Sequence, residues 1–224
     1  VDGARALLIN TPHNPTGAVY TPETIEAIAA IARRHDLWLI SDEVYDGMVW
    51  DGRHLSPRAL TGMAERTVVV GSLSKSHAMT GFRLGWAVAP APLAALMGDL
   101  ALEVAYGLPG FVQEAGLFAV TAAAEEEASL IATFRRRRDL ALRVLSEAPA
   151  VRLAAPDGAM YVMPDIRATG MSGRAFAEAL LEAERIAVMP GESFGAAAAG
   201  HVRIALTVED AAAVPKLSPG ITAM

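Results

Sequence analysis

Short apolar runs bounded by turn residues dominate the first ninety positions, and a single amphipathic segment lies between the first two runs. Such runs are typical of buried strands. The amphipathic segment begins at Thr21-Pro22-Glu23, which has an N-capping hydroxyl, a proline and an acid in helix-initiating order, and it continues to His35. Strands that alternate with a helix predict a parallel, doubly wound α/β sheet with both faces covered. The four runs span residues 4–10, 37–41, 67–71 and 84–89.

In the second half of the chain, the spacing of apolar residues first becomes helical and then becomes mixed. Long helical periods predict one helix over residues 92–106 and one or two more over 111–148, with a break near 122–128. After Pro149 a smaller α+β unit is expected, with a helix over 172–184. Its strand-like segments are residues 151–153, 160–165, 186–189 and 202–206.

This change of pattern predicts two domains. We expect a partial large domain over residues 1–149 and a small C-terminal domain over 150–224. A helix should follow Glu209-Asp210, but Pro215 and Pro219 indicate that this terminal helix is cut short or altered.

Composition narrows the class of protein. The 224 residues include no cysteine, which excludes disulfides and thiolate metal sites, and the five histidines show no metal-ligand spacing. A net charge of −6 offers no general basic field to nucleic acid, and no apolar run is long enough to span a membrane. The N-terminus has no signal-peptide layout, so we expect a cytoplasmic protein without nucleic-acid or membrane partners. The basic run at residues 135–138 is interpreted as a solvated helix face.

One lysine has an unusual setting. The sequence has two lysines against 17 arginines, and Lys75 lies in a turn rich in serine and glycine, directly after an apolar run. A deprotonated lysine amine can attack a carbonyl and form a Schiff base, whereas a guanidinium stays protonated. A surface lysine in a loop is the alternative, and the surrounding segments decide between the two.

Polar segments follow the predicted strands, at the edge where open α/β sheets bind ligands. Each has a structural alternative: a turn, a helix N-cap or a surface charge. Their joint occurrence, in this order and at strand ends, favours a binding site. The segments are Asn10-Thr11-Pro12-His13-Asn14-Pro15-Thr16-Gly17, Ser41-Asp42-Glu43-Val44-Tyr45, Ser72-Leu73-Ser74-Lys75 with Arg83, and His201-Val202-Arg203.

In these segments the chain resembles the class I/II aminotransferases of fold type I, which depend on pyridoxal phosphate. The resemblance implies a three-layer α/β/α large domain, present here in part, with a smaller α+β domain. It implies transfer of an amino group between an L-amino acid and a 2-oxo acid, in a homodimer. It also implies that the N-terminal part of the large domain is absent from these 224 residues.

The resemblance further implies roles toward the cofactor. Lys75 would hold pyridoxal phosphate as a Schiff base and move the proton between the substrate Cα and the cofactor. Asp42 would pair with the pyridine nitrogen, and a protonated ring is the better electron sink. Asn14 and Tyr45 would hydrogen-bond the phenolic oxygen of the ring.

Two anionic groups need partners as well. By resemblance, Ser72 and Arg83 would hold the cofactor phosphate, and Arg203 would bind the substrate α-carboxylate. Lesser contributions are expected from Gly17, Ser74 and Tyr161.

Three other functions remain open from the sequence. The same scaffold supports a β-lyase, a decarboxylase or an oxidase acting on an amino acid, because reaction choice depends on which Cα bond stands perpendicular to the ring. A cofactor-sensing domain of a transcription regulator and an inactive fragment are the non-enzymatic alternatives.

Overall fold

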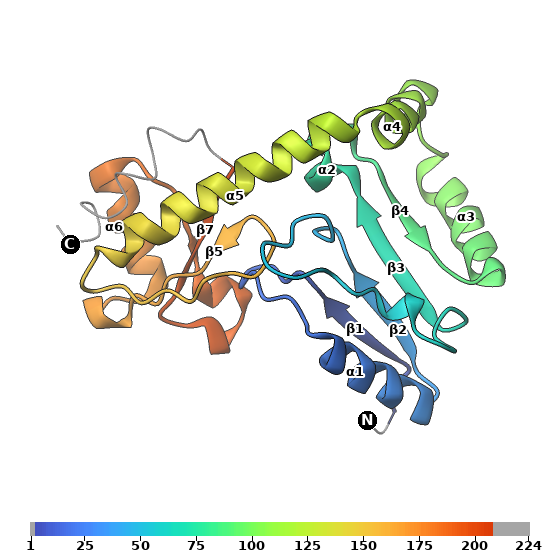
Figure 1. The fold of residues 1–224 in the computed structure, drawn as a ribbon, viewed down its shortest axis with the longest axis horizontal. Coiled ribbons are helices and arrows are strands. Elements are labelled where there is room, and N and C mark those ends of the chain that lie inside the picture. The colour runs from blue at the N-terminus through green and yellow to red at the C-terminus, as the bar shows by residue number, and fades with distance from the viewer. Residues whose placement is uncertain (1–2, 208–224) are drawn as a thin grey trace. The chain divides into compact units, whose positions relative to one another are not determined.

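The computed structural model describes residues 3–207, and the chain divides into two compact units, each with its own sheet (Figure 1). Unit 1 comprises Val1–Pro12 and Val19–Ile131, and unit 2 comprises His13–Ala18 and Ala132–Met224. The division falls inside helix α5 (Ala124–Ser146). The domain boundary near residues 148–150 stays a prediction.

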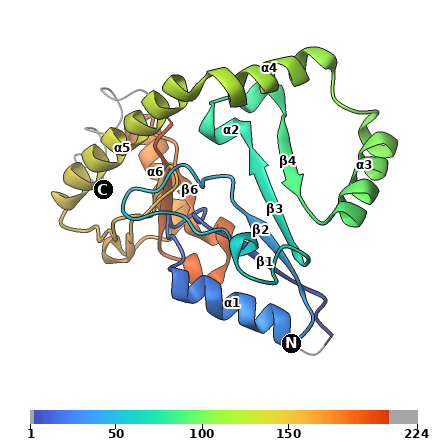
Figure 2. The same ribbon diagram turned by 45° about the vertical axis from the view of Figure 1, so that its right-hand side comes forward.

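Unit 1 is built on a four-stranded sheet in the order β1-β2-β3-β4. The strands β1 (Ala6–Asn10), β2 (Trp38–Asp42) and β3 (Thr67–Ser72) are parallel, as the alternating pattern predicted. Helix α1 (Pro22–Arg34) connects the first two strands and lies beside them in both ribbon views (Figure 2). The predicted α/β class is therefore confirmed.

Helix α1 forms because its start is capped and one of its faces is apolar. The Thr21 hydroxyl accepts a hydrogen bond from the Thr24 N–H at 3.3 Å, Pro22 is the first helical residue, and Glu23 lies in the first turn. The buried face of α1 packs with strand residues into the main core of unit 1. This core consists of Ile9, Ile25, Ala29, Ala32, Leu37, Leu39 and Met63.

The fourth strand departs from the parallel arrangement that was expected. Strand β4 (Gly85–Val88) runs antiparallel to β3, with Gly71 opposite Trp86. Residues 73–84 contain only the four-residue helix α2 (Leu73–Ser76) and a 3₁₀ turn at Thr80–Phe82. A parallel crossover usually contains a full helix, and this link contains none longer than four residues, so the chain returns in the opposite direction.

The sequence predicted cover on both faces of the sheet, and within residues 3–207 the face opposite α1 carries exposed apolar side chains. Leu8 is 72% exposed, and Trp38 is also exposed. Helices α3 (Ala91–Ala105) and α4 (Gly110–Ala122) present further exposed side chains, including Leu100 and Phe118. Within residues 3–207, side chains on the sheet face that packs against α1 are thus far more buried than those on the opposite face. The predicted helix break is confirmed, since α4 ends at Ala122 and α5 begins at Ala124.

Unit 2 holds a small antiparallel sheet in the order β5-β7-β6. Its strands are β5 (Tyr161–Val162), β6 (Met189–Pro190) and β7 (Val202–Ala205). Helix α6 (Gly173–Glu184) is capped by the Ser172 hydroxyl, which accepts from the Ala175 N–H at 3.2 Å. Residues 151–153 form no strand; Arg152 makes an isolated bridge with Asp165.

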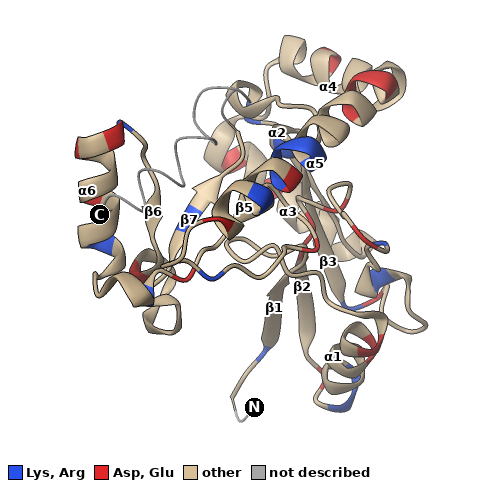
Figure 3. Cartoon of the chain, turned by 60° about the vertical axis from the view of Figure 1, so that its left-hand side comes forward, with Lys and Arg blue, Asp and Glu red and all other residues tan. Residues whose placement is uncertain are grey.

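The arginine run on α5 is only partly a solvated face. Figure 3 marks the positions of basic residues on this helix in blue. Arg135 and Arg136 are exposed, but Arg137 donates to the Leu206 carbonyl at 3.1 Å and Arg138 to the Pro156 carbonyl at 3.2 Å. These two side chains therefore tie α5 to other segments of unit 2, which corrects the sequence interpretation.

Two further findings concern the described part of the chain. None of its helices combines the length and apolarity that crossing a membrane requires. Residues 3–207 also contain no group of three or more His, Asp or Glu side chains placed to hold a metal ion. The expected terminal helix lies outside the described residues.

Candidate active site

The carboxyl ends of the parallel strands in unit 1 bring two predicted site residues, Asp42 and Ser72, to one edge of the sheet. Asn10 is in register with Asp42, and Asp42 with Val70, two residues before Ser72. Because side chains alternate along a strand, Asp42 and Ser72 point to the same face of the sheet. Asp42 is half-buried, and its Oδ1 accepts a hydrogen bond from the Val44 N–H at 3.3 Å. Sheet geometry therefore places a carboxylate and a hydroxyl at the edge where open α/β sheets bind ligands.

Lys75 and Tyr45 approach one another at this edge. The Lys75 Nζ lies 5.9 Å from the centre of the Tyr45 ring, and Tyr45 is 3% exposed. Lys75 stands on α2, which begins immediately after β3 and is capped by Ser72, whose hydroxyl accepts from the Ser74 N–H at 3.1 Å. The serine-rich turn thus sets the position of the amine, and Ser74 contributes through its backbone.

Arg83 also belongs to unit 1, but few contacts hold its side chain. It is exposed and has a left-handed backbone with φ +53°. Its Nη1 donates to the Thr80 carbonyl at 2.9 Å. The neighbouring Leu84 carbonyl accepts from the Leu73 N–H, which fixes the backbone of this loop against the start of α2.

The loop at residues 13–18 belongs to unit 2 and contains the other predicted group. Gly17 has φ +71°, and a Cβ there would lie 2.4 Å from the Pro156 Cβ. Its carbonyl accepts from the Gly158 N–H at 2.8 Å. Only glycine fits such a position, so Gly17 acts by close packing of this loop.

Arg203 on β7 is the most completely surrounded cation of the predicted set. Its Nη1 donates to the Asn14 Oδ1 at 2.9 Å across 189 positions of sequence. Its Cζ lies 4.4 Å from the centre of the Tyr161 ring and 4.9 Å from that of Phe194. The Nε is buried and has no hydrogen-bond partner among residues 3–207. A guanidinium held by two rings and an amide presents its remaining donors in a fixed geometry, which suits a carboxylate.

The pairing of Asn14 with Arg203 was not foreseen from the sequence. The resemblance assigned Asn14 to the cofactor ring and Arg203 to the substrate, but the two side chains are hydrogen-bonded to each other. Tyr161, expected to contribute in some unspecified way, contacts Arg203. The structure thus collects Asn14, Tyr161 and Arg203 in unit 2, and Asp42, Tyr45, Ser72, Ser74, Lys75 and Arg83 in unit 1.

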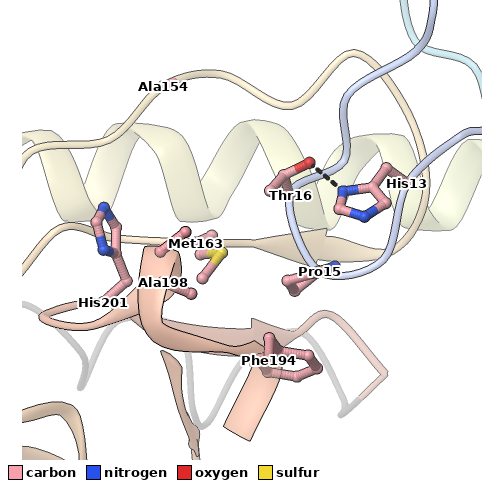
Figure 4. A pocket seen from close by; sticks show the side chains of 9 residues that line it. His13, Pro15, Thr16, Ala154, Met163, Phe194, Ala198 and His201 are labelled. Atoms are coloured by element: carbon pink, nitrogen blue, oxygen red, sulfur yellow. Dashed lines mark hydrogen bonds between the residues drawn. The ribbon is translucent and has the colours of Figure 1, made fainter. Parts of the chain in front are cut away.

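A cavity of about 360 Å³ lies beside this group in unit 2 (Figure 4). Phe194, Met163 and His201 line it together with the loop residues His13 and Thr16. The Thr16 hydroxyl and the His13 Nδ1 are hydrogen-bonded at 2.7 Å, and burial lowers the pKa of the His13 imidazole. A neutral imidazole suits this largely apolar wall.

Sequence reasoning missed several residues around these groups. Phe194 carried no signal, because an aromatic residue near glycines is common in turns. Glu43 was quoted only as part of a motif. Its carboxylate is 5% exposed and accepts hydrogen bonds from the His54 Nε2 at 2.9 Å and the Ser56 hydroxyl at 2.8 Å. Both donors come from the loop that carries Tyr45, so Glu43 anchors that loop. No local pattern could have revealed these partners.

The side chains of unit 1 fit pyridoxal phosphate by the chemistry of their donor set. Lys75 offers an amine to the aldehyde, and Asp42 a carboxylate to the pyridine nitrogen. Tyr45 offers a hydroxyl to the ring oxygen, and Ser72 and Arg83 offer donors to a phosphate. All five lie around the carboxyl ends of β2 and β3 or in the loops that follow.

Comparison with known proteins agrees with this chemistry. The family model for aminotransferase class I and II matches residues 2–215. Arginine–pyruvate transaminase AruH of Pseudomonas aeruginosa is 50% identical over 204 residues, covering 91% of this chain and 52% of that protein. Within the sequence, residues 36–45 and 72–85 are the segments that predict a likeness to arginine–pyruvate transaminase. Putative aminotransferase YugH of Bacillus subtilis is 40% identical over 199 residues, covering 89% of this chain and 51% of that protein.

Solved structures give the same result. The aromatic aminotransferase from Pyrococcus horikoshii aligns with a TM-score of 0.94 at 37% identity, covering 100% of this chain and 60% of that one. The chain spans about half the length of the curated relatives it matches. The match along residues 2–215 shows that this chain belongs to the class I and II aminotransferases, a family whose members depend on pyridoxal phosphate.

Proposed function

We propose that the protein carrying this chain is a pyridoxal-phosphate-dependent aminotransferase that moves an amino group between an L-amino acid and a 2-oxo acid. The observation that supports it most is the position of Lys75, whose Nζ lies 5.9 Å from the centre of the buried Tyr45 ring. The short helix that carries Lys75 begins where β3 ends. Asp42 ends β2, the adjacent strand.

Each candidate site residue of unit 1 has a defined role in this proposal. When bound, the cofactor supplies an electron sink for the pair released at the substrate Cα. The Lys75 amine would bind the cofactor aldehyde and, when the substrate occupies that position, would take the proton from the substrate Cα. Asp42 keeps a proton on the pyridine nitrogen, and Ser72 with Arg83 binds the phosphate. Tyr45 donates to the phenolic oxygen of the ring.

In unit 2, Arg203 binds the carboxylate of the substrate. Its contacts with Asn14, Tyr161 and Phe194 restrict how the guanidinium can turn. A carboxylate bound to a fixed guanidinium has few orientations, and this limits which Cα bond is presented for reaction. Arginine and pyruvate are the first donor and acceptor to test, because the name of the 50%-identical relative contains both.

We also infer a homodimer and a cytoplasmic location. Exposed apolar side chains on α3 and α4, among them Leu100 and Phe118, are consistent with a covered surface in an assembly. These 224 residues contain no cysteine and so form no disulfide that would need an oxidising compartment. Sedimentation of the complete protein tests the dimer, and cell fractionation tests the location.

Covalent trapping tests the main proposal directly. The complete protein is incubated with pyridoxal phosphate, reduced with borohydride, digested and analysed by mass spectrometry. We expect one modified lysine, Lys75, and no adduct in Lys75→Arg. Modification spread equally over Lys75 and Lys216 would contradict the assignment.

Product analysis then decides the reaction. Incubation with arginine and pyruvate, or with other donor and acceptor pairs, should yield a new 2-oxo acid and a new amino acid in equal amounts. Release of ammonia or carbon dioxide without amination of the acceptor would contradict amino-group transfer and indicate other pyridoxal phosphate chemistry.

A further inference from the structure

Phe194 stands beside the carboxylate-binding cation without having been assigned a role. Its ring centre lies 4.9 Å from the Arg203 Cζ, and Tyr161 lies at 4.4 Å. The same phenylalanine ring lines the cavity of about 360 Å³ that opens beside it. The Phe194 ring thus forms part of the cavity wall and also contacts the Arg203 guanidinium.

The backbone around Phe194 is fixed to the strand that carries Arg203. Strand β6 pairs with β7, and Met189 is in register with Arg203. The 3₁₀ turn Gly191–Phe194 follows β6 directly, and the Gly191 N–H donates to the His201 carbonyl at 2.7 Å. A Cβ on Gly191 would lie 2.7 Å from that same carbonyl oxygen, so the turn can approach β7 this closely only with glycine.

Glu192 supplies a second attachment for this turn. Its Oε1 accepts from the Gly173 N–H at 2.9 Å and from the Gly200 N–H at 3.4 Å. Hydrogen bonds from backbone N–H groups, its own first and then that of Gly173, lower the pKa of the Glu192 carboxyl. One carboxylate therefore links the start of α6, the turn that ends in Phe194 and the segment before β7.

An arginine side chain in this setting has little freedom. A planar guanidinium stacks well on aromatic faces because it is weakly hydrated, and the attraction grows when water is excluded. Holding it in place before the ligand arrives removes part of the entropy cost of ordering a long side chain on binding. The Asn14 contact fixes one edge of the group, and the rings restrict its rotation about that contact.

We propose that Phe194 is a positioning residue for Arg203, and that together with Tyr161 it orders the guanidinium for a substrate carboxylate. The inference rests on the proposed function only for the identity of the carboxylate. It assigns Phe194 no contact with the cofactor and no proton transfer. Its effect should therefore appear in carboxylate affinity and in KM, with kcat and cofactor affinity nearly unchanged.

The test compares Phe194→Leu, which keeps apolar volume without a π face, with Phe194→Tyr, which keeps the face. In the complete protein with pyridoxal phosphate bound, we expect Phe194→Leu to weaken propionate binding and raise the KM for a 2-oxo acid by about three- to thirtyfold. Phe194→Tyr should restore both values to within about twofold. Met163→Leu is the matched control, because Met163 lines the same cavity.

A double-mutant cycle separates positioning from general damage. In an Arg203→Lys background the planar guanidinium is absent, so adding Phe194→Leu should change the propionate Kd by less than about twofold. An equal loss in both backgrounds would overturn the proposal, as would unchanged propionate binding in Phe194→Leu alone. The Kd is read without turnover, so failure of amino-group transfer would leave this result interpretable. Thermal unfolding of each variant confirms that the comparison is between folded proteins.

Discussion

The two arginines assigned to anions are held in opposite ways. Arg203 in unit 2 contacts an amide and two aromatic rings, and its Nε is buried. Arg83 in unit 1 is exposed and bonds to a carbonyl three residues away. A side chain that is already ordered loses less entropy when an anion binds. The carboxylate site that we propose for unit 2 is thus organised by side-chain contacts, whereas strand ends and a short helix position the candidate residues of unit 1.

The largest effect should separate chemistry from carboxylate binding. Lys75→Arg keeps a positive charge but removes the nucleophilic amine, so we expect kcat to fall by about 10³-fold or more. Propionate binding, which we assign to unit 2, should change little. A spectrophotometric assay measures the first quantity and calorimetry the second. Lys75→Arg turnover within tenfold of the unchanged protein would remove Lys75 from its proposed role.

Arg203→Ala should have the next largest effect. Loss of charge-assisted hydrogen bonds costs about 1.5–3 kcal/mol, so kcat/KM should fall by about ten- to a hundredfold. Reducible cofactor should still be found on Lys75. The comparison between the units would break if Arg203→Ala released the cofactor but left KM unchanged.

A glycine pair tests how tightly the loop of unit 2 is packed. Gly17→Ala should lower the free energy of unfolding by about 2–4 kcal/mol, from the left-handed backbone and the contact with Pro156 together. Gly170→Ala is the control, because Gly170 has φ +74° and no atom within 4 Å of an added Cβ. It should cost about 1 kcal/mol. Equal losses in urea denaturation would show that close packing at Gly17 contributes nothing.

Arg83→Ala should have a smaller effect than Arg203→Ala, because the side chain must be ordered when it binds the phosphate. We expect the Kd of pyridoxal phosphate to rise by about tenfold. Arg53→Ala, which removes another exposed arginine of unit 1, should leave it unchanged. Fluorescence titration measures both. A loss of 10³-fold for Arg83→Ala would reverse the proposed ranking of the two arginines.

The smallest expected effect is a pH dependence in unit 2. Hydrogen bonds from the Arg167 side chain hold the pKa of the Asp165 carboxyl well below its ordinary value of 3.8. The unfolded chain therefore binds this proton first as the pH falls, and the stability that the pair contributes is lost below about pH 4. Because Arg167 is largely exposed, we expect less than about 1 kcal/mol. Asp165→Asn should remove this part of the acid sensitivity in thermal unfolding measured from pH 6 to 2.

Local signals in the sequence were enough for most elements of the fold. The cap at Thr21 and the proline after it located α1, and the apolar runs located β1 to β3. The direction of β4 was missed, because strand periodicity is the same for parallel and antiparallel neighbours. The relevant information lay in the content of the link at residues 73–84, which carries no long helical pattern.

Most candidate residues could be named from the sequence, but their contacts could not. Lys75 and Asp42 could be named from motifs at strand ends. The bond between Asn14 and Arg203 joins residues 189 positions apart, and Phe194 reaches Arg203 through the pairing of β6 with β7. Such contacts depend on how the chain folds back on itself, and no periodicity or motif encodes them locally.

Two carboxylates stand next to one another at the end of β2, and their side chains point to opposite faces of the sheet. Asp42 ends β2, and Glu43, which follows it, is bonded to His54 and Ser56. Since successive side chains point to opposite faces, inserting or deleting one residue within β2 would exchange the carboxylate that we assign to the cofactor, Asp42, with the loop-anchoring carboxylate, Glu43. We expect length changes of a single residue in β2 to be far less tolerated than substitutions. A design that transplants this edge must therefore keep the number of residues in the strand, because that number decides which carboxylate points to which face.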